Sequence, residues 1–477
     1  MASERTFLPR SIQARWLELR AWIMRHPDAP WWLRVLRLGL FQFGMGVSLA
    51  PITGTLNRVL IHELAISAGF VAALMSIHYF VSPIRTVVGH ISDQKRMEGR
   101  WRTPYLVLGA MLTYGGLATA PFSLILFSPE SNLQGWMVYV FSIAIFLVYG
   151  IGVNIVETSY LALVSDITSD GERGKTLAIL WLMLVIGTVV GSLVVGLLLT
   201  NYTHSNLIRV MQGSAVVFLI CTFLALFNQE KMRPDGTLVA EVSRQARQSL
   251  GTSIRTLWQS SALRGMFLIF FVATLGFGTH DILLEPYGGE VLGMSVTATT
   301  FLTAIWGVSM IIAIIIAGWW LWRGHASGKL LIAGGMAGIV GFGVVSLSGF
   351  WGGAWLFQLG VSIIGMGRGL FIVGSIATVM QLADNAHTGL FLGMWGVVQA
   401  LAQGFGTIGG GIARDYIQAT TQSVVLGYVG VYIVAGLFLV FMVGYMVIRR
   451  IDRRLANGEI RSPWSGLQDI PADQLLY

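Results

Sequence analysis

Long apolar runs alternate with short polar connections along this chain. Twelve of these runs can cross a bilayer as helices, since a spanning helix needs about 20 mostly apolar residues. They lie at 36–56, 67–89, 104–127, 136–163, 176–199, 207–227, 265–284, 297–322, 330–349, 353–380, 388–412 and 423–447. The pattern predicts an all-α polytopic membrane protein with 12 transmembrane helices.

The longest polar segment divides the runs into two sets of six. Gly150-Ile151-Gly152 and Gly365-Met366-Gly367 begin corresponding runs, and the same offset separates Gly174 from Gly389. A 6+6 parallel repeat is the arrangement of the major facilitator fold, which has its binding site between the halves. We expect a cytoplasmic amphipathic segment, a six-helix half, a cytoplasmic linker with an amphipathic helix, a second six-helix half and a cytoplasmic tail. Their ranges are 1–34, 35–227, 228–264, 265–449 and 450–477.

Basic residues gather on one side of the predicted membrane. The chain has 31 Lys and Arg against 23 Asp and Glu, a formal net charge of +8. Most of the basic residues lie in the N-terminal segment, the linker and the tail, whereas Arg58, Arg209 and Arg414 lie on the other side. Because Lys and Arg concentrate in cytoplasmic loops, both termini are predicted to be cytoplasmic. Topology and anionic lipid explain the basic excess, so no nucleic-acid partner is expected.

The composition excludes several classes of protein. Apolar residues make up 55% of the chain and charged residues 11%, against about 25% charged in a soluble domain. Such a chain is neither a soluble enzyme nor disordered. Its single cysteine, Cys221, excludes a disulfide framework. It contains no GxxxxGK[ST] motif, no HExxH motif and no recognisable Ser–His–Asp set, so we expect neither nucleotide binding nor an enzyme.

Glu157, Arg85 and Arg368 are predicted to lie at membrane depth, where an ionisable group is expensive and points to function. Glu157 lies in the run 136–163, one turn after Asn154, and Arg368 lies in the run 353–380. Both helices would line the central cavity of a major facilitator. We therefore expect Glu157 and Arg368 to face each other there, neutralised by pairing or by a ligand. A purely structural ion pair is the alternative.

Three carboxylates and a histidine lie close together in the sequence, at and just after the end of the run 265–284. These residues are His280, Asp281, Glu285 and Glu290. Pro286, Gly288 and Gly289 are expected to break the helix there. Asp281 and Glu285 stand four residues apart, so they would share one face of any helix that remains. One histidine among flexible carboxylates does not specify a metal, and no metal site is predicted.

The polar connection after the run 67–89 resembles the loop between the second and third helices of major facilitators. Gly89 allows a tight turn, Asp93 can cap a helix N-terminus, and Arg96 and Arg100 can pair with carboxylates. The spacing is stretched relative to the GxxxDRxGRR motif of that superfamily. The segment is expected to act as a conformational lock rather than to contact substrate.

Several longer motifs resemble the PucC/LhaA family, the bacteriochlorophyll-delivery branch of the major facilitators. The resemblance covers about 35–447. Its motifs are Leu56-Asn57-Arg58-Val59, Ser82-Pro83-Ile84-Arg85, Trp101-Arg102-Thr103-Pro104-Tyr105, Gly393-Met394-Trp395-Gly396 and, the most specific of them, Glu285-Pro286-Tyr287-Gly288-Gly289-Glu290.

This resemblance implies a photosynthetic membrane protein, in an inner, intracytoplasmic or thylakoid membrane, that helps to assemble light-harvesting complexes. It would deliver (bacterio)chlorophyll to nascent antenna polypeptides or chaperone them. The antenna polypeptides, reaction-centre or pigment-synthesis proteins and lipid are the implied partners. The chain departs from the family at Asn154-Ile155-Val156-Glu157-Thr158, where relatives often have His-Thr-Thr-Gln-Thr, and at His280, where they often have Gln.

A chlorophyll magnesium takes one axial ligand, often a neutral imidazole or an amide oxygen. Candidates at membrane depth are His78, His280, Gln42, Asn154 and Gln399. A histidine in a membrane is more often hydrogen-bonded to a neighbouring helix, and spacing does not choose among these residues.

Three other functions remain open from the sequence. The first is a proton-coupled transporter of a small solute, with Glu157, Asp281 or Glu285 as the proton carrier. The second is a pigment-free scaffold for assembly. The third, a pigment-synthesis enzyme, is poorly supported, because no residues for the esterification are recognisable.

Overall fold

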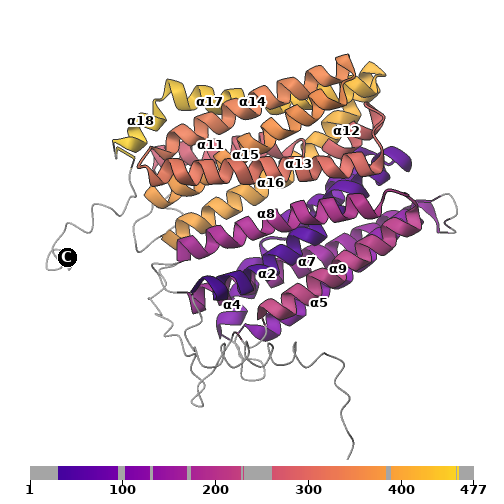
Figure 1. The fold of residues 1–477 in the computed structure, drawn as a ribbon, viewed down its shortest axis with the longest axis horizontal. Helices are drawn as coiled ribbons and strands as arrows, with labels where there is room; N and C mark the ends of the chain where they lie inside the picture. The colour runs from indigo at the N-terminus through magenta and orange to yellow at the C-terminus, as the bar shows by residue number, and fades with distance from the viewer. Residues whose placement is uncertain are drawn as a thin grey trace, which may run out of the picture.

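The structure is a computed structural model that describes residues 31–94, 102–128, 131, 133–168, 173–226, 229, 260–382, 388–457 and 459–460. These residues are almost entirely helical, and the long helices run roughly side by side (Figure 1). Within the described part, ten helices are long and apolar enough to cross a membrane. Many of their apolar side chains are exposed, including Leu197, Ile315 and Trp355, as expected of a surface that faces lipid.

The first half of the bundle contains the helices from α2 to α9. They are α2 (Trp31–Ala50) with the π-helical turns η1 (Pro51–Leu56) and η2 (Val59–Glu63), then α3 (Ala68–Phe80), α4 (Ile84–Gln94), α5 (Thr103–Thr119), η3 (Ala120–Phe122), α6 (Ser123–Leu126), α7 (Gly135–Ile167), α8 (Arg173–Leu198) and α9 (His204–Leu226). The predicted span 67–89 is divided into α3 and α4 around Pro83, which cannot donate a backbone hydrogen bond.

The second half contains the helices from α11 to α18. They are α11 (Ser261–Gly278), α12 (Leu284–Glu290), α13 (Val296–Trp322), α14 (Ser327–Trp351), α15 (Ala354–Leu382), α16 (Thr388–Thr421), α17 (Val424–Ile448) and α18 (Ile451–Ala456). The segment 1–30, most of the linker and the tail beyond 460 lie outside the described residues. The amphipathic helices predicted in the N-terminal segment and the linker therefore stay predictions.

The expected helix break near Pro286 is wrong in position. The chain leaves the helix earlier, in the turns at 279–283, and Pro286, Gly288 and Gly289 all lie within the short helix α12. Pro286 is tolerated because it stands in the first turn of α12, where backbone N–H groups have no intrahelical partner. The carboxylates near this break therefore lie on two different elements.

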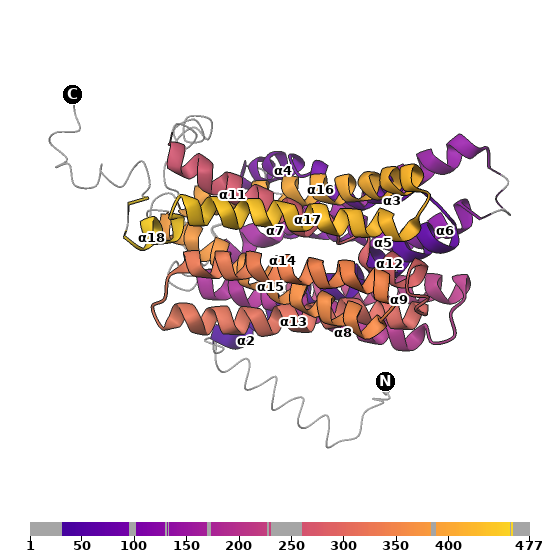
Figure 2. The same ribbon diagram turned by 90° about the horizontal axis from the view of Figure 1, so that it is seen from above.

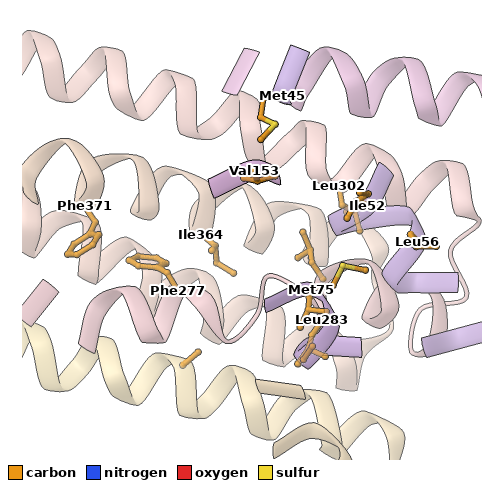
Figure 3. Close-up of a cluster of buried hydrophobic side chains, with 14 of the residues drawn as sticks. Met45, Ile52, Leu56, Met75, Val153, Phe277, Leu283, Leu302, Ile364 and Phe371 are labelled. Carbon is orange, nitrogen blue, oxygen red and sulfur yellow. The ribbon is translucent and has the colours of Figure 1, made fainter. Parts of the chain in front are cut away.

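The two halves meet where α3 packs on α16 and α8 packs on α13. Gly404 and Gly411 of α16 allow the first contact, since a Cβ on either residue would press against Tyr79 or the Ala68 carbonyl of α3. Buried apolar side chains from both halves, such as Met45, Val153, Phe277 and Ile364, fill the interior (Figure 3).

Candidate functional site

In the first half, an ion pair joins α4 to α7. Arg85 of α4 reaches Glu157 of α7, with 2.5 Å between Nη2 and Oε2. Its Nε also donates to the side-chain oxygen of Asn154, one turn before Glu157. Asn154 is held in place because its amide donates to the carbonyls of His78 and Gly150. The pair keeps appreciable exposure, 39% for the Arg85 side chain and 26% for Glu157.

A second charged group lies in the other half. Arg368 of α15 donates to Gln403 of α16 at 2.8 Å, and Gln403 donates in turn to Asp281. The direct distance from Arg368 Nη1 to Asp281 Oδ2 is 3.8 Å, and 32% of the Asp281 side chain is exposed. His280 is buried beside Asp281, with its ring edge-on to Phe342.

The expected pairing of Glu157 with Arg368 is therefore wrong, since each is neutralised within its own half. Sequence position alone does not show how a helix is rotated, and the rotation places Arg85, which the prediction left unpaired, next to Glu157. The two charged groups are still related in space. Tyr79, on α3 where it packs on α16, lies within electrostatic range of Asp281, Arg368, Glu157 and Arg85.

The five candidate pigment ligands differ in how free their donor atoms are. His78 Nδ1 lies 2.8 Å from the Met75 carbonyl, which favours the tautomer with the proton on Nδ1. No described residue forms a hydrogen bond with Nε2, so its lone pair is free. The Tyr79 and Tyr149 rings lie beside the imidazole, with ring centroids 3.8 and 6.2 Å away. His78 thus has the chemistry of an axial ligand.

Three of the other four candidates fit less well. The Asn154 oxygen accepts from Arg85, and the Gln399 oxygen accepts from Thr274 at 2.5 Å. The His280 side chain is only 1% exposed. Gln42 lies on α2 and is partly buried.

Asp281 and Glu285 do not share a helix face. Asp281 lies in the turn before α12 and faces Arg368, whereas Glu285 lies on α12 and accepts a hydrogen bond from Thr303 of α13 at 2.9 Å. Among the described residues, no group of three or more His, Cys, Asp or Glu side chains could hold a metal ion.

The residues of the α12 motif contact both halves. Gly289 leaves room for the Arg58 guanidinium, and Gly288 packs against Thr299. Tyr287 donates to the Val345 carbonyl of α14 at 3.1 Å. Glu290 accepts from Arg414 of α16 and from the Tyr428 hydroxyl.

Many bonds between the halves gather at the end of the bundle that includes α12, and we call this contact region the seam. From the first half it contains η1, η2, the end of α8 and the start of α3; from the second it contains α12, the start of α13 and the end of α16. In Figure 2 the α12 end lies opposite α18.

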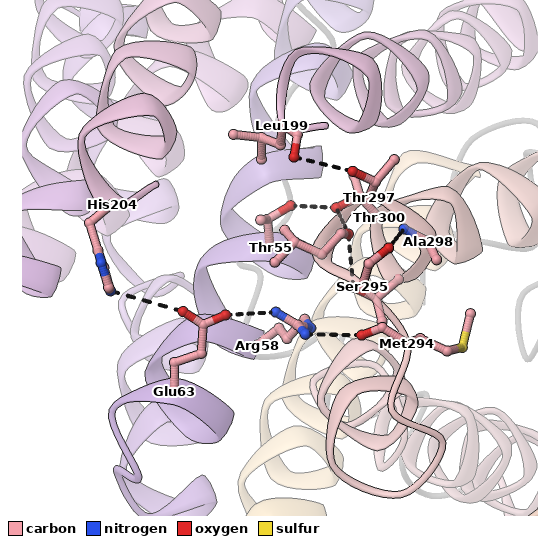
Figure 4. A network of polar contacts seen from close by, with 12 residues as sticks. Thr55, Arg58, Glu63, Leu199, His204, Met294, Ser295, Thr297, Ala298 and Thr300 are labelled. Atoms are coloured by element: carbon pink, nitrogen blue, oxygen red, sulfur yellow. Dashed lines mark hydrogen bonds and ion pairs between the residues drawn. The ribbon is translucent and has the colours of Figure 1, made fainter. Parts of the chain in front are cut away.

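Figure 4 shows part of the seam. Its bonds join Thr55 to Thr300, Arg58 to the Met294 carbonyl and Thr297 to the Leu199 carbonyl, at 3.0, 3.1 and 3.2 Å. Asn57 donates to the Ile282 carbonyl, and Asp415 of α16 accepts from the first two N–H groups of α3.

The predicted conformational lock is only partly within the described residues. Gly89 lies inside α4 beside Thr158 of α7, so the tight turn expected at this residue is wrong. Asp93 is on α4, but its side chain is outside the description, as are Arg96 and Arg100. Arg102, after the lock segment, donates to Ser92 at 2.7 Å. The locking role stays a prediction.

Comparison with known proteins decides the family. The family model described as "PUCC protein" matches residues 55–455. The chain belongs to the PucC protein family. It is 36% identical to an uncharacterized protein from the puhA-bchM intergenic region of Rhodobacter capsulatus, over 84% of this chain and 85% of the relative. It is 33% identical to Protein PucC of Rhodovulum sulfidophilum, over 82% and 87% of the two chains.

Solved transporters share the fold of this PucC family member. A bacterial homologue of the human lysosomal transporter Spinster, in an inward-facing and unoccupied conformation, superposes with a TM-score of 0.66 at 12% identity, over 90% of this chain and 98% of that one. The predicted all-helical major facilitator fold and the family resemblance are thus confirmed. Family and fold together indicate an integral membrane protein.

Several residues that the PucC family fold brings together were not predicted from the sequence. Gln403 links Arg368 to Asp281, Asp415 caps α3 from the opposite half, and Gly54 lies against Glu285. Arg85 could have been found, because an arginine inside an apolar run needs a partner. Gln403, Asp415 and Gly54 carry no comparable signal, since their roles depend on which helices are neighbours.

Proposed function

We propose that this protein handles (bacterio)chlorophyll during the assembly of light-harvesting complexes. Membership of the PucC family supports a role connected with photosynthesis. The observation that carries the pigment proposal is His78, whose Nδ1 is engaged by a backbone carbonyl while Nε2 keeps its lone pair beside two tyrosine rings. Magnesium in a chlorophyll accepts such a neutral imidazole.

The proposal assigns a place and partners to the chain. The protein would lie in a photosynthetic membrane with both termini in the cytoplasm, and would pass pigment to nascent antenna polypeptides or hold them while pigment inserts. Reaction-centre or pigment-synthesis proteins are further proposed partners. The pigment tail would lie against the exposed apolar side chains of the bundle.

The test is pigment counted per chain after purification in mild detergent from pigmented membranes, together with the absorption spectrum. We expect a stoichiometric pigment with a shifted long-wavelength band, and loss of that pigment in His78→Leu. His325→Leu is the matched control, because His325 is exposed and stacks on Trp320 beyond the end of α13. Pigment bound equally by both variants would remove His78 from the site. A pigment-free protein that still co-purifies with antenna polypeptides would replace the carrier with a scaffold.

A proton-coupled transporter of a small solute is the second candidate. The partly exposed charges of Arg85, Glu157 and Asp281 at membrane depth favour it, because such groups commonly mark substrate and ion pathways. Gradient-driven uptake into vesicles without antenna proteins would support it, and pigment-dependent antenna assembly without any such uptake would argue against it.

A further inference from the structure

Glu285 is the most deeply buried carboxyl of the seam. The residue is 2% exposed. Its Oε1 accepts from Thr303 of α13 at 2.9 Å, and its Oε2 has no hydrogen-bond partner among the described residues. The carboxyl also crosses between the halves, because it occupies the space that a Cβ on Gly54 of η1 would fill. Opening the seam would therefore expose it.

The two arginines near Glu285 direct their terminal nitrogens to other groups, and the buried Nε atoms of both have no hydrogen-bond partner among the described residues. Arg58 donates to Glu63 at 3.0 Å and to the Met294 carbonyl at 3.1 Å, and Arg414 pairs with Glu290 and Asp415. No described Lys, Arg or His lies within ion-pair distance of Glu285.

The remaining elements around Glu285 bring no compensating charge. η2 also contributes His62, which lies near Gly289, and Glu63. α12 itself contributes Glu290, and α13 has no ionisable side chain. Burying a carboxylate without a cation costs several kcal/mol, whereas a neutral carboxyl with one hydrogen bond costs far less.

We propose that Glu285 is a proton-binding site that is occupied while the seam is closed and that empties when the two halves separate. The carboxyl keeps its proton between Gly54 and Thr303. On separation, water reaches the group, and hydration of the carboxylate removes the desolvation cost that holds the proton in the closed state. Because binding linkage is reciprocal, acid favours the closed seam and alkali the open one. One such proton changes the ratio of closed to open protein by at most about tenfold per pH unit.

This inference goes beyond the pigment proposal, because it holds whichever cargo the protein handles. The test places spin labels on either side of the seam, in a Cys221→Ser background that removes the single cysteine of the chain. Suitable sites are the exposed Ser205 on α9 and Thr421 on α16. In nanodiscs, we expect the longer label distance to gain population as pH rises. Glu285→Gln keeps the shape of the protonated carboxyl, so its distances should stay short at every pH.

Glu459→Gln is the control, since Glu459 is exposed and pairs with Arg454 far from the seam; it should follow the unaltered protein. Distances that do not change with pH, or a Glu285→Gln protein that responds to pH as the unaltered one does, would overturn the proposal.

A second measurement does not depend on opening. The infrared spectrum of the closed protein should contain the C=O band of a buried protonated carboxyl, and Glu285→Gln should remove it. If the band is unchanged in a folded Glu285→Gln protein, the proton lies elsewhere and the proposal is wrong.

Discussion

The charged residues of the seam and those of the centre differ in burial and in whether they form hydrogen bonds across the two halves. In the centre, Arg85 pairs with Glu157 and Arg368 with Gln403 and Asp281, each within its own half and with part of the charge exposed. At the seam, Arg58 and Arg414 are buried, and Arg58 and Asp415 bond across the halves.

The difference shows which bonds must break when the halves move apart. The central pairs travel with their halves, so they remain available to a ligand in any state. The seam bonds exist only in the closed state, so their free energy helps to set how often that state opens. Substitutions in the two regions should accordingly differ in size and in kind.

The largest loss of unfolding free energy is expected for Arg414→Met. It leaves Glu290 with an uncompensated buried charge and removes a contact with the Tyr428 ring, so unfolding free energy should fall by about 3–5 kcal/mol. Equilibrium unfolding in mixed micelles measures this. Arg454→Met removes an exposed pair and should cost about 0–1 kcal/mol. Equal losses in the two variants would contradict the burial argument.

A smaller loss, in the stability of the closed seam, is expected for Gly54→Ala. The added methyl group overlaps the Glu285 carboxyl, so the closed seam should lose about 1–3 kcal/mol and the spin-label distance should lengthen. Gly213→Ala, on α9, is the matched control because nothing lies within 4 Å of the added Cβ; it should leave the distance unchanged. A Gly54→Ala protein with unaltered spin-label distances would show that the seam is less tightly packed around Gly54 than the structure indicates.

The smallest effect on stability is expected when both partners of the first central pair are neutralised, in Arg85→Met with Glu157→Gln. A partly exposed pair contributes about 0–1 kcal/mol, so unfolding should barely change and the label distance should stay short. A loss as large as that of Arg414→Met would mean that the central pair also holds the two halves together.

Sequence reasoning predicted the helices well because burial in lipid demands long apolar runs, and each predicted run falls on a helix. It missed the interruption at Pro83 and misplaced the one near Pro286. Hydropathy does not show where a buried helix changes direction. The short helix α12 depends on contacts with η1 and α13 that are distant in the sequence.

The sequence by itself determined the membrane-spanning class, the division of the apolar runs into two sets of six and the family. These follow from composition, run length and local motifs. Only the tertiary structure decided that Glu157 meets Arg85, that Arg368 meets Gln403 and that Glu285 lies against Gly54. Such pairings depend on the rotation and neighbours of each helix, and those are set by packing between residues far apart in the chain.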